Sequence, residues 1–237
     1  MDNKPRFGKK WLLVLLGLAI LGIGYHSYKV YNFKRMIKPF VMKDNILFEE
    51  ILTVENSNPQ ITYGEFFDKA KKNIEIREDT IRGVKMLDPY IYEKELNEYA
   101  EFLVLENKSL YAFINLLKGK IESESKNEKN LHDSLNRLKN KAYFNAVSGR
   151  DAPSRQFTDQ VIEEQTEALI EADKEFEGKF IEWKKTFSDL LSREESYQKN
   201  SPSFLFGRNL VPIIKNHIKT IQSNMVTKYR FLEGTNK

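Results

Sequence analysis

The chain has 237 residues, 41% of them hydrophobic and 30% charged, which is typical of a folded protein and excludes a disordered chain. No cysteine is present, so disulfides, thiolate metal sites and c-type haem attachment are excluded. The net charge of +4 arises near the N-terminus: the first 35 residues hold seven Lys/Arg against Asp2, whereas the remainder holds 31 basic and 33 acidic residues and indicates no binding of nucleic acid.

The first predicted element is a transmembrane helix over residues 11–28. An unbroken apolar run from Trp11 to Tyr25 lies between two lysines and Lys29. Extension to Tyr28 gives 18 residues, about 27 Å of helix, and flanking lysines that snorkel can make up the difference from a bilayer core of roughly 30 Å. The residues expected to face lipid are Trp11, Leu12, Leu13, Val14, Leu15, Leu16, Leu18, Ile20, Leu21 and Ile23.

A cleaved secretory signal is the alternative interpretation of this segment. Basic residues precede the apolar run, and Gly22 and Gly24 occupy the positions of small residues ahead of a cleavage site, although no A-x-A occurs. The retained anchor is favoured. Because only ten residues precede the span, residues 1–10 are expected in the cytoplasm and the bulk of the chain outside. This topology is that of a single-pass protein of a bacterial inner (cytoplasmic) membrane.

Residues 29–60 are predicted to connect this anchor to a body. Apolar residues continue at helical spacing after Lys29, and the interfacial helix is expected to end at Pro39, since a residue before proline avoids the α region. A separate short helix is expected near residues 45–54, and residues 55–60 have turn composition.

Residues 61–237 are predicted to form an all-α, elongated antiparallel bundle of about four main helices, because their apolar residues recur at spacings of three and four. Thr62 with Glu65 predicts a capping box at the start of the first helix, and Ile61 with Phe66 a hydrophobic staple. Asp88-Pro89 predicts the start of the next helix.

Three further helices, two of them long, complete the predicted bundle. The helix after Pro89 has an apolar stripe that disappears over residues 122–130 and resumes at Leu131. Either a loop joins two helices there, or one long helix runs past the end of its partner and is solvated all round. Residues 148–155 form the clearest break. A helix of about 40 residues is expected to follow and to stop at residues 200–202, and a final helix is expected over residues 210–232.

The sequence contains no recognisable catalytic constellation. A carboxylate-bridged metal pair in a bundle needs Glu-x-x-His, but Lys129 and Ile214 stand three residues before His132 and His217. The row Glu163, Glu167 and Glu171 is typical of a solvated face near a helix N-terminus. No enzymatic activity, cofactor or metal site is therefore predicted.

Two apolar clusters have alternative interpretations. Trp183 and Phe187 belong to an aromatic stripe that either packs in the core or lines a pocket for a small apolar molecule. Phe204, Leu205 and Phe206 lie in a predicted connection. They either close the end of the bundle or form an exposed contact surface for membrane or protein.

These observations predict a membrane-anchored, non-enzymatic interaction or scaffold protein. Its expected partners are the lipid bilayer, through residues 11–28, and an envelope protein or a second copy of the chain. One alternative is a ligand-sensing or carrier bundle that binds a small apolar molecule beside Trp183 and Phe187. Another is a secreted effector or inhibitor released by cleavage near Gly24.

Overall fold

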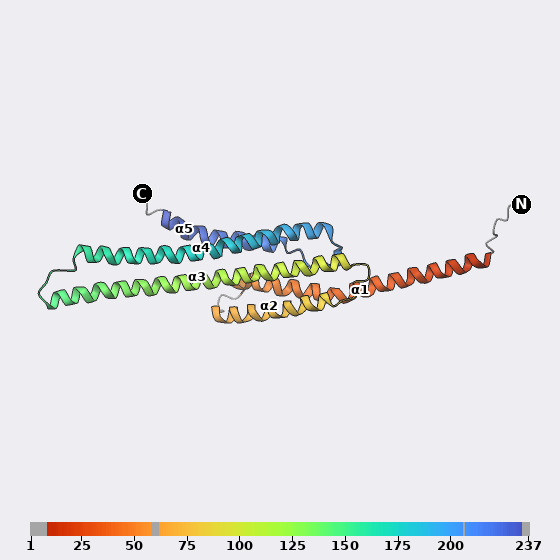
Figure 1. Ribbon diagram of the computed structural model, residues 1–237, viewed down its shortest axis with the longest axis horizontal. Coiled ribbons are helices and arrows are strands. Elements are labelled where there is room, and N and C mark those ends of the chain that lie inside the picture. Colours follow the sequence, from red (N-terminus) through yellow and green to blue (C-terminus); the bar gives the residue numbers. More distant parts are fainter. Residues whose placement is uncertain (1–8, 58–61, 206, 234–237) are drawn as a thin grey trace. The chain divides into compact units, whose positions relative to one another are not determined.

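The computed structural model describes residues 9–57, 62–205 and 207–233, with side chains described over 11–53, 62–205 and 207–223. The predicted all-α class is confirmed in these ranges (Figure 1). The elements are α1 (Lys9–Ser57), α2 (Tyr63–Lys85), α3 (Glu93–Val147), α4 (Arg155–Asn200), the 3-10 turn η1 (Ser203–Leu205) and α5 (Val211–Glu233).

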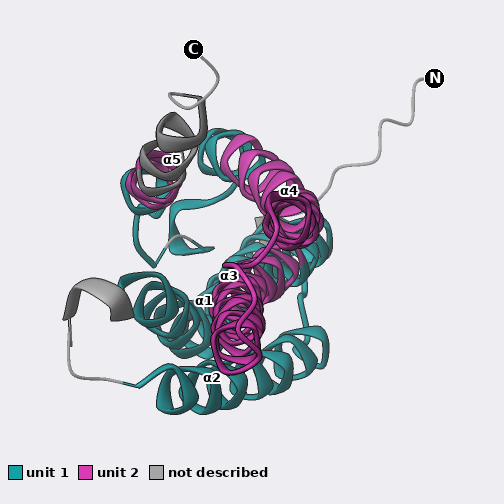
Figure 2. Ribbon diagram, turned by 90° about the vertical axis from the view of Figure 1, so that its left-hand side faces the viewer, with its two compact units in different colours: residues 1–104, 193–213 teal, residues 105–192, 214–237 magenta. Residues whose placement is uncertain are grey.

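The chain divides into two compact units (Figure 2). Unit 1 comprises residues 1–104 and 193–213, and unit 2 comprises residues 105–192 and 214–237. The boundaries fall inside α3 and α4 and near the start of α5. Each unit is therefore built from segments distant in sequence.

Helix α1 continues through Pro39 to Ser57, so the predicted end at Pro39 and the separate helix near residues 45–54 are wrong. Proline inside a helix removes one hydrogen bond and costs about 3 kcal/mol. Burial of one face of α1 offsets this cost. The side chains on that face that are at most 2% exposed are Phe33, Ile37, Val41 and Phe48. Burial of such side chains stabilises by about 1.5 to 3 kcal/mol each, so packing in unit 1 outweighs the local preference of proline.

Helix α2 begins as predicted, because Thr62 Oγ1 accepts a hydrogen bond from the backbone of Glu65 and the Glu65 carboxylate accepts one from the backbone of Thr62. Ile61, the other half of the predicted staple, lies outside the described residues. Gly83 lets α2 approach α1 closely, since a Cβ atom there would lie 2.7 Å from Cε1 of Phe40.

Helix α3 begins at Glu93 and not at Asp88-Pro89, because residues 86–92 form a connecting loop. The helix then runs without a break over residues 122–130. Polar pairs to α4 lie along this segment: Lys126 Nζ is 3.3 Å from Glu175 Oε2, and Lys179 Nζ is 3.5 Å from Glu122 Oε2. Residues 122–130 are therefore helical and not a loop, but the expectation that such a helix is solvated all round is wrong, because α4 lies beside it and Ser123 is buried.

The remaining boundaries agree with the predicted breaks. Helix α3 ends at Val147 and α4 begins at Arg155, where Ser154 Oγ accepts a hydrogen bond from the backbone of Phe157. Helix α4 ends at Asn200, beside the predicted stop, and α5 begins at Val211. Four helices thus follow α1 in the described ranges.

The core of unit 1 combines side chains of α1, α2 and the start of α3 with those of residues 197–205. Its buried members are Phe33, Ile37, Val41, Ile81, Val84, Leu96, Tyr99, Ala100, Leu103, Tyr197 and Leu205. The core of unit 2 combines α3, α4 and the start of α5. Its members that are at most 1% exposed include Leu110, Phe113, Leu116, Trp183, Phe187, Leu190 and Ile214.

Candidate membrane-anchoring site

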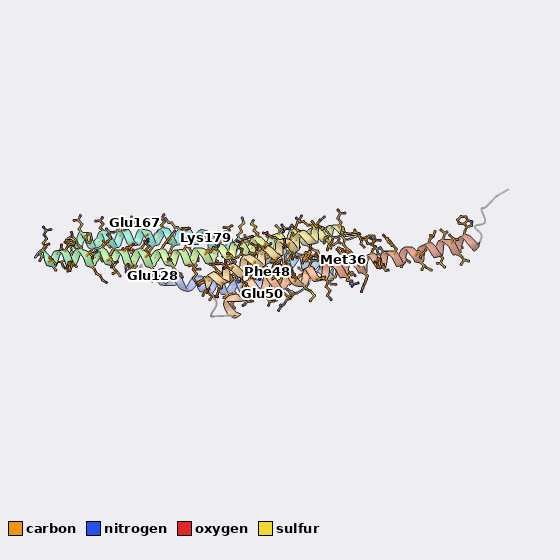
Figure 3. The ribbon with its side chains drawn as sticks, turned by 90° about the horizontal axis from the view of Figure 1, so that it is seen from below. Met36, Phe48, Glu50, Glu128, Glu167 and Lys179 are labelled. Atoms are coloured by element: carbon orange, nitrogen blue, oxygen red, sulfur yellow. The ribbon has the colours of Figure 1, made fainter. Side chains whose placement is uncertain are left out.

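The first part of α1 exposes apolar side chains around its whole circumference (Figure 3). All ten residues predicted to face lipid, from Trp11 to Ile23, are between 53% and 70% exposed. Among the described residues, α1 is the helix that is long and apolar enough to cross a membrane. An apolar surface of this kind is unfavourable in water and is satisfied by hydrocarbon. The coarse prediction of a membrane-spanning helix near the N-terminus thus agrees with the structure.

A series of exposed tyrosines marks the end of this apolar surface. Tyr25, Tyr28 and Tyr31 are 59%, 63% and 65% exposed. Tyrosine is enriched at the membrane–water interface, because its ring is apolar and its hydroxyl needs a polar partner. The tyrosines therefore agree with a span that ends near Tyr28.

The loop between α2 and α3 packs against α1 at the same level. The Tyr90 hydroxyl and His26 Nδ1 hydrogen-bond at 3.1 Å, and their ring centroids are 5.6 Å apart. The rings of Tyr25 and Tyr90 pack edge to face, and their centroids are 6.5 Å apart. These contacts hold residues 86–92, which the sequence analysis did not assign to a site, beside the last turn of the predicted span.

Asp88 gives this loop its conformation and a charge contact with α1. Its carboxylate accepts a hydrogen bond of 3.1 Å from the backbone of Tyr90, which adopts a left-handed conformation with φ +52°. Lys29 Nζ lies 3.3 Å from the other carboxylate oxygen. The hydrogen bond from Tyr90, and then the contact with Lys29, lower the pKa of the Asp88 carboxyl. The hydrogen bond to Asp88 raises the pKa of Lys29.

The predicted contact residues Phe204 and Leu205 pack within unit 1. Leu205 is 1% exposed, and the half-buried Phe204 ring lies 5.9 Å from that of Phe33 and 5.0 Å from that of Tyr92. Phe206 lies outside the described residues. For Phe204 and Leu205, the structure thus favours packing against the core over an exposed surface.

A buried ion pair joins α1 to α2 just beyond this region. Arg77 Nη1 lies 2.7 Å from Asp44 Oδ1 and donates a hydrogen bond of 2.9 Å to the Asp44 carbonyl. The two side chains are 0% and 1% exposed. In the sequence, Arg77 interrupts the apolar stripe of α2. Asp44 was detectable by the same criterion, since it lies between Val41 and Phe48 on the buried face of α1.

Trp183 and Phe187 lie in the core of unit 2 and are both 0% exposed. They surround His217 of α5, whose ring centroid is 5.8 Å from that of Trp183, 4.8 Å from that of Phe187 and 4.5 Å from that of Phe113. Burial lowers the pKa of His217 to about 3. The ring is therefore neutral at physiological pH and serves as part of an aromatic core.

The predicted acidic row is solvated. Glu163, Glu167 and Glu171 of α4 are all exposed, and Glu167 is labelled in Figure 3. Within the residues that the structure describes, no cluster of three or more His, Asp or Glu side chains is arranged to hold a metal ion.

Comparison with known proteins finds no matching protein-family model, no matching curated protein and no matching solved structure.

Proposed function

We propose that the chain is a membrane-anchored, non-enzymatic interaction or scaffold protein with a helical extracytoplasmic body. Two features of α1 carry this proposal: residues 11–28 expose an apolar surface, and the same helix continues without a break into the packed core of unit 1. A removable signal has no need to be built into the helix that organises a core. This continuity favours the anchor over the secreted alternative.

The proposed location is the inner membrane of a bacterium, with residues 1–10 in the cytoplasm. The short basic N-terminal segment supports this orientation. The chain lacks cysteine, so a single cysteine introduced at the exposed Ile46 reports the side of the membrane on which unit 1 lies. In intact cells, Ile46→Cys is expected to react with a membrane-impermeant maleimide, and protection until lysis would reverse the orientation.

Exposed apolar residues of unit 2 support an interaction role. On α3, the side chains of Leu131 and Leu135 are 52% and 46% exposed. Tyr143, Phe144 and Val147, farther along α3, are 71%, 69% and 69% exposed. A stripe with helical spacing that stays exposed on a pair of long helices is suited to docking of a further helix. We infer that this stripe receives an envelope protein or a second copy of the chain.

Membrane fractionation with N-terminal sequencing tests the anchor. The full chain is expected in the membrane pellet after an alkaline carbonate wash, with residues 1–24 intact. A soluble chain that starts at Tyr25 would support the secreted alternative and contradict the proposal.

Crosslinking in intact cells tests the interaction role. The wild type is expected to give a crosslinked species, and Leu131→Ser with Leu135→Ser is expected to reduce its yield. Tyr111→Ser is the matched control, because Tyr111 lies on α3 and is 46% exposed, like Leu135. A protein that crosslinks to nothing, or that responds equally to both variants, would contradict the proposed docking stripe.

A further inference from the structure

We propose that the loop between α2 and α3, residues 86–92, is a second membrane contact that lies in the phospholipid headgroup region beside the end of the span. This inference rests on the proposed anchor, since without a bilayer around residues 11–28 the loop has no lipid to meet. It adds a surface of the folded body to the membrane contact, which the apolar helix alone does not provide.

The position of the loop along α1 carries the inference. Tyr90 contacts Tyr25 and His26, which are within three residues of Tyr28, the end of the predicted span. Three residues of helix correspond to about 4.5 Å. Tyr25 and His26 lie inside the predicted span, at most this distance on the hydrocarbon side of Tyr28, so a loop held against them is at the boundary between the hydrocarbon core and the headgroups.

The chemistry of the loop suits this environment. Met86 and Ile91, which flank the turn at Tyr90, are 84% and 51% exposed. Single exposed apolar residues are common on protein surfaces, so their exposure alone indicates nothing. Here, however, both belong to a loop that Tyr90 holds against the last turn of the apolar span. The Tyr90 hydroxyl meanwhile supplies the polar partner that His26 needs at that depth.

Charge near the loop agrees with a phospholipid surface. Lys29 stands beside Asp88, and Lys34, Arg35 and Lys38 follow on α1. Cations close to the end of a span attract the phosphates of anionic lipids. A soluble apolar partner would gain no binding energy from these cations. These cations and the exposed side chains of Met86 and Ile91 together favour a lipid surface as the partner of the loop.

The absence of cysteine from the sequence allows a direct test with single-cysteine variants of the full chain. Met86→Cys, Ile91→Cys, Ile46→Cys and Leu18→Cys are labelled with the environment-sensitive fluorophore NBD. Each is reconstituted into vesicles of phosphatidylcholine and phosphatidylglycerol that carry nitroxide lipids labelled either at the headgroup or deep in the acyl chain. Ile46 is the matched control, because it is 51% exposed like Ile91 but lies about 27 Å along α1 from Tyr28.

The labels at Met86 and Ile91 are expected to be quenched by the headgroup nitroxide and to emit at shorter wavelength than the label at Ile46. The label at Leu18 is expected to be quenched by the deep nitroxide. If Leu18 is quenched and the loop labels behave like Ile46, the anchor stands and the loop contact is overturned. If Leu18 is not quenched either, the anchor itself fails and the loop contact fails with it.

A further variant tests whether the contacts of Tyr90 position the loop. Tyr90→Asn removes the ring from Tyr25 and His26, and asparagine accepts the left-handed backbone that this position requires. In this background the headgroup quenching of the Ile91 label is expected to fall toward that of Ile46, whereas the Leu18 label is unchanged. Undiminished quenching at Ile91 would overturn the assigned role of Tyr90 contacts in holding the loop at the membrane.

Discussion

The two units each bury an ionisable side chain but neutralise it in different ways. In unit 1, Arg77 is fully buried, and the carboxylate of Asp44, 2.7 Å away, compensates its charge. In unit 2, His217 is enclosed by Phe113, Trp183 and Phe187, and burial lowers its pKa to about 3. Arginine cannot lose its proton in a protein, whereas histidine can. The guanidinium therefore requires a partner, and the imidazole requires only the loss of its charge.

The largest expected effect comes from removing one member of the buried pair in unit 1. Arg77→Leu leaves the Asp44 carboxylate buried without its cation, and the free energy of unfolding is expected to fall by about 3 to 5 kcal/mol. Chemical unfolding of the full chain in lipid nanodiscs, followed by circular dichroism, measures this change. A loss below about 1 kcal/mol would mean that water solvates the Asp44 carboxylate in the variant. It would contradict the conclusion that the buried charges of unit 1 require each other.

Removing both charges is expected to cost less than removing one. In the double variant Asp44→Leu with Arg77→Leu, neither charge of the pair remains, and apolar replacements of a buried pair are often neutral or stabilising by about 1 to 4 kcal/mol. The same unfolding assay on both single variants and the double variant gives the coupling energy. Additive losses would show that the two side chains do not depend on each other.

The neutral histidine of unit 2 predicts a pH dependence of the free energy of unfolding. Since the pKa of His217 is about 3 in the folded chain and about 6.5 unfolded, the unfolded chain binds more protons between these values. Stability is therefore lost as pH falls below 6.5, by up to about 1.4 kcal/mol per pH unit from this group. His217→Leu is expected to remove this component, and the difference between the two unfolding profiles isolates it from carboxylates. Parallel profiles would contradict a neutral, buried His217.

The smallest expected effect concerns the helix caps of the two units. Thr62→Ala removes the capping box of α2 in unit 1 and is expected to cost about 1 kcal/mol. Ser154→Ala removes a cap of α4 in unit 2 that makes a single hydrogen bond of 3.3 Å, so its cost is expected to be lower. Thermal unfolding of each variant checks this order, and a larger loss for Ser154→Ala would reverse it.

Local patterns in the sequence were sufficient for most of the fold. The capping box at Thr62, the break at residues 148–155 and the stop after Asn200 are signals that a short window contains, and the structure has helix boundaries beside each. The apolar run at residues 11–28 is likewise local. Such signals determine where helices begin and end when the local preference and the tertiary packing agree.

The misses have a common physical cause, which is packing against segments distant in sequence. Pro39 stays inside α1 because the face from Phe33 to Phe48 is buried. Residues 122–130 remain helical with α4 alongside, where Lys126 and Glu122 find partners. The loop at Tyr90 was missed because its importance lies in contacts with Tyr25 and His26, more than 60 residues earlier in the chain. No local pattern contains this information.

Because α1 continues through Pro39 without a break, it fixes the rotation of unit 1 about the helix axis relative to the anchor. A flexible linker would let the body rotate freely above the bilayer. A helix instead advances about 1.5 Å and turns about 100° with each residue. One residue inserted between Tyr28 and Phe33 would therefore swing unit 1 by more than a quarter of a revolution about the helix axis. The number of residues between the membrane span and the core thus determines the direction, around the helix axis, in which unit 1 faces its neighbours.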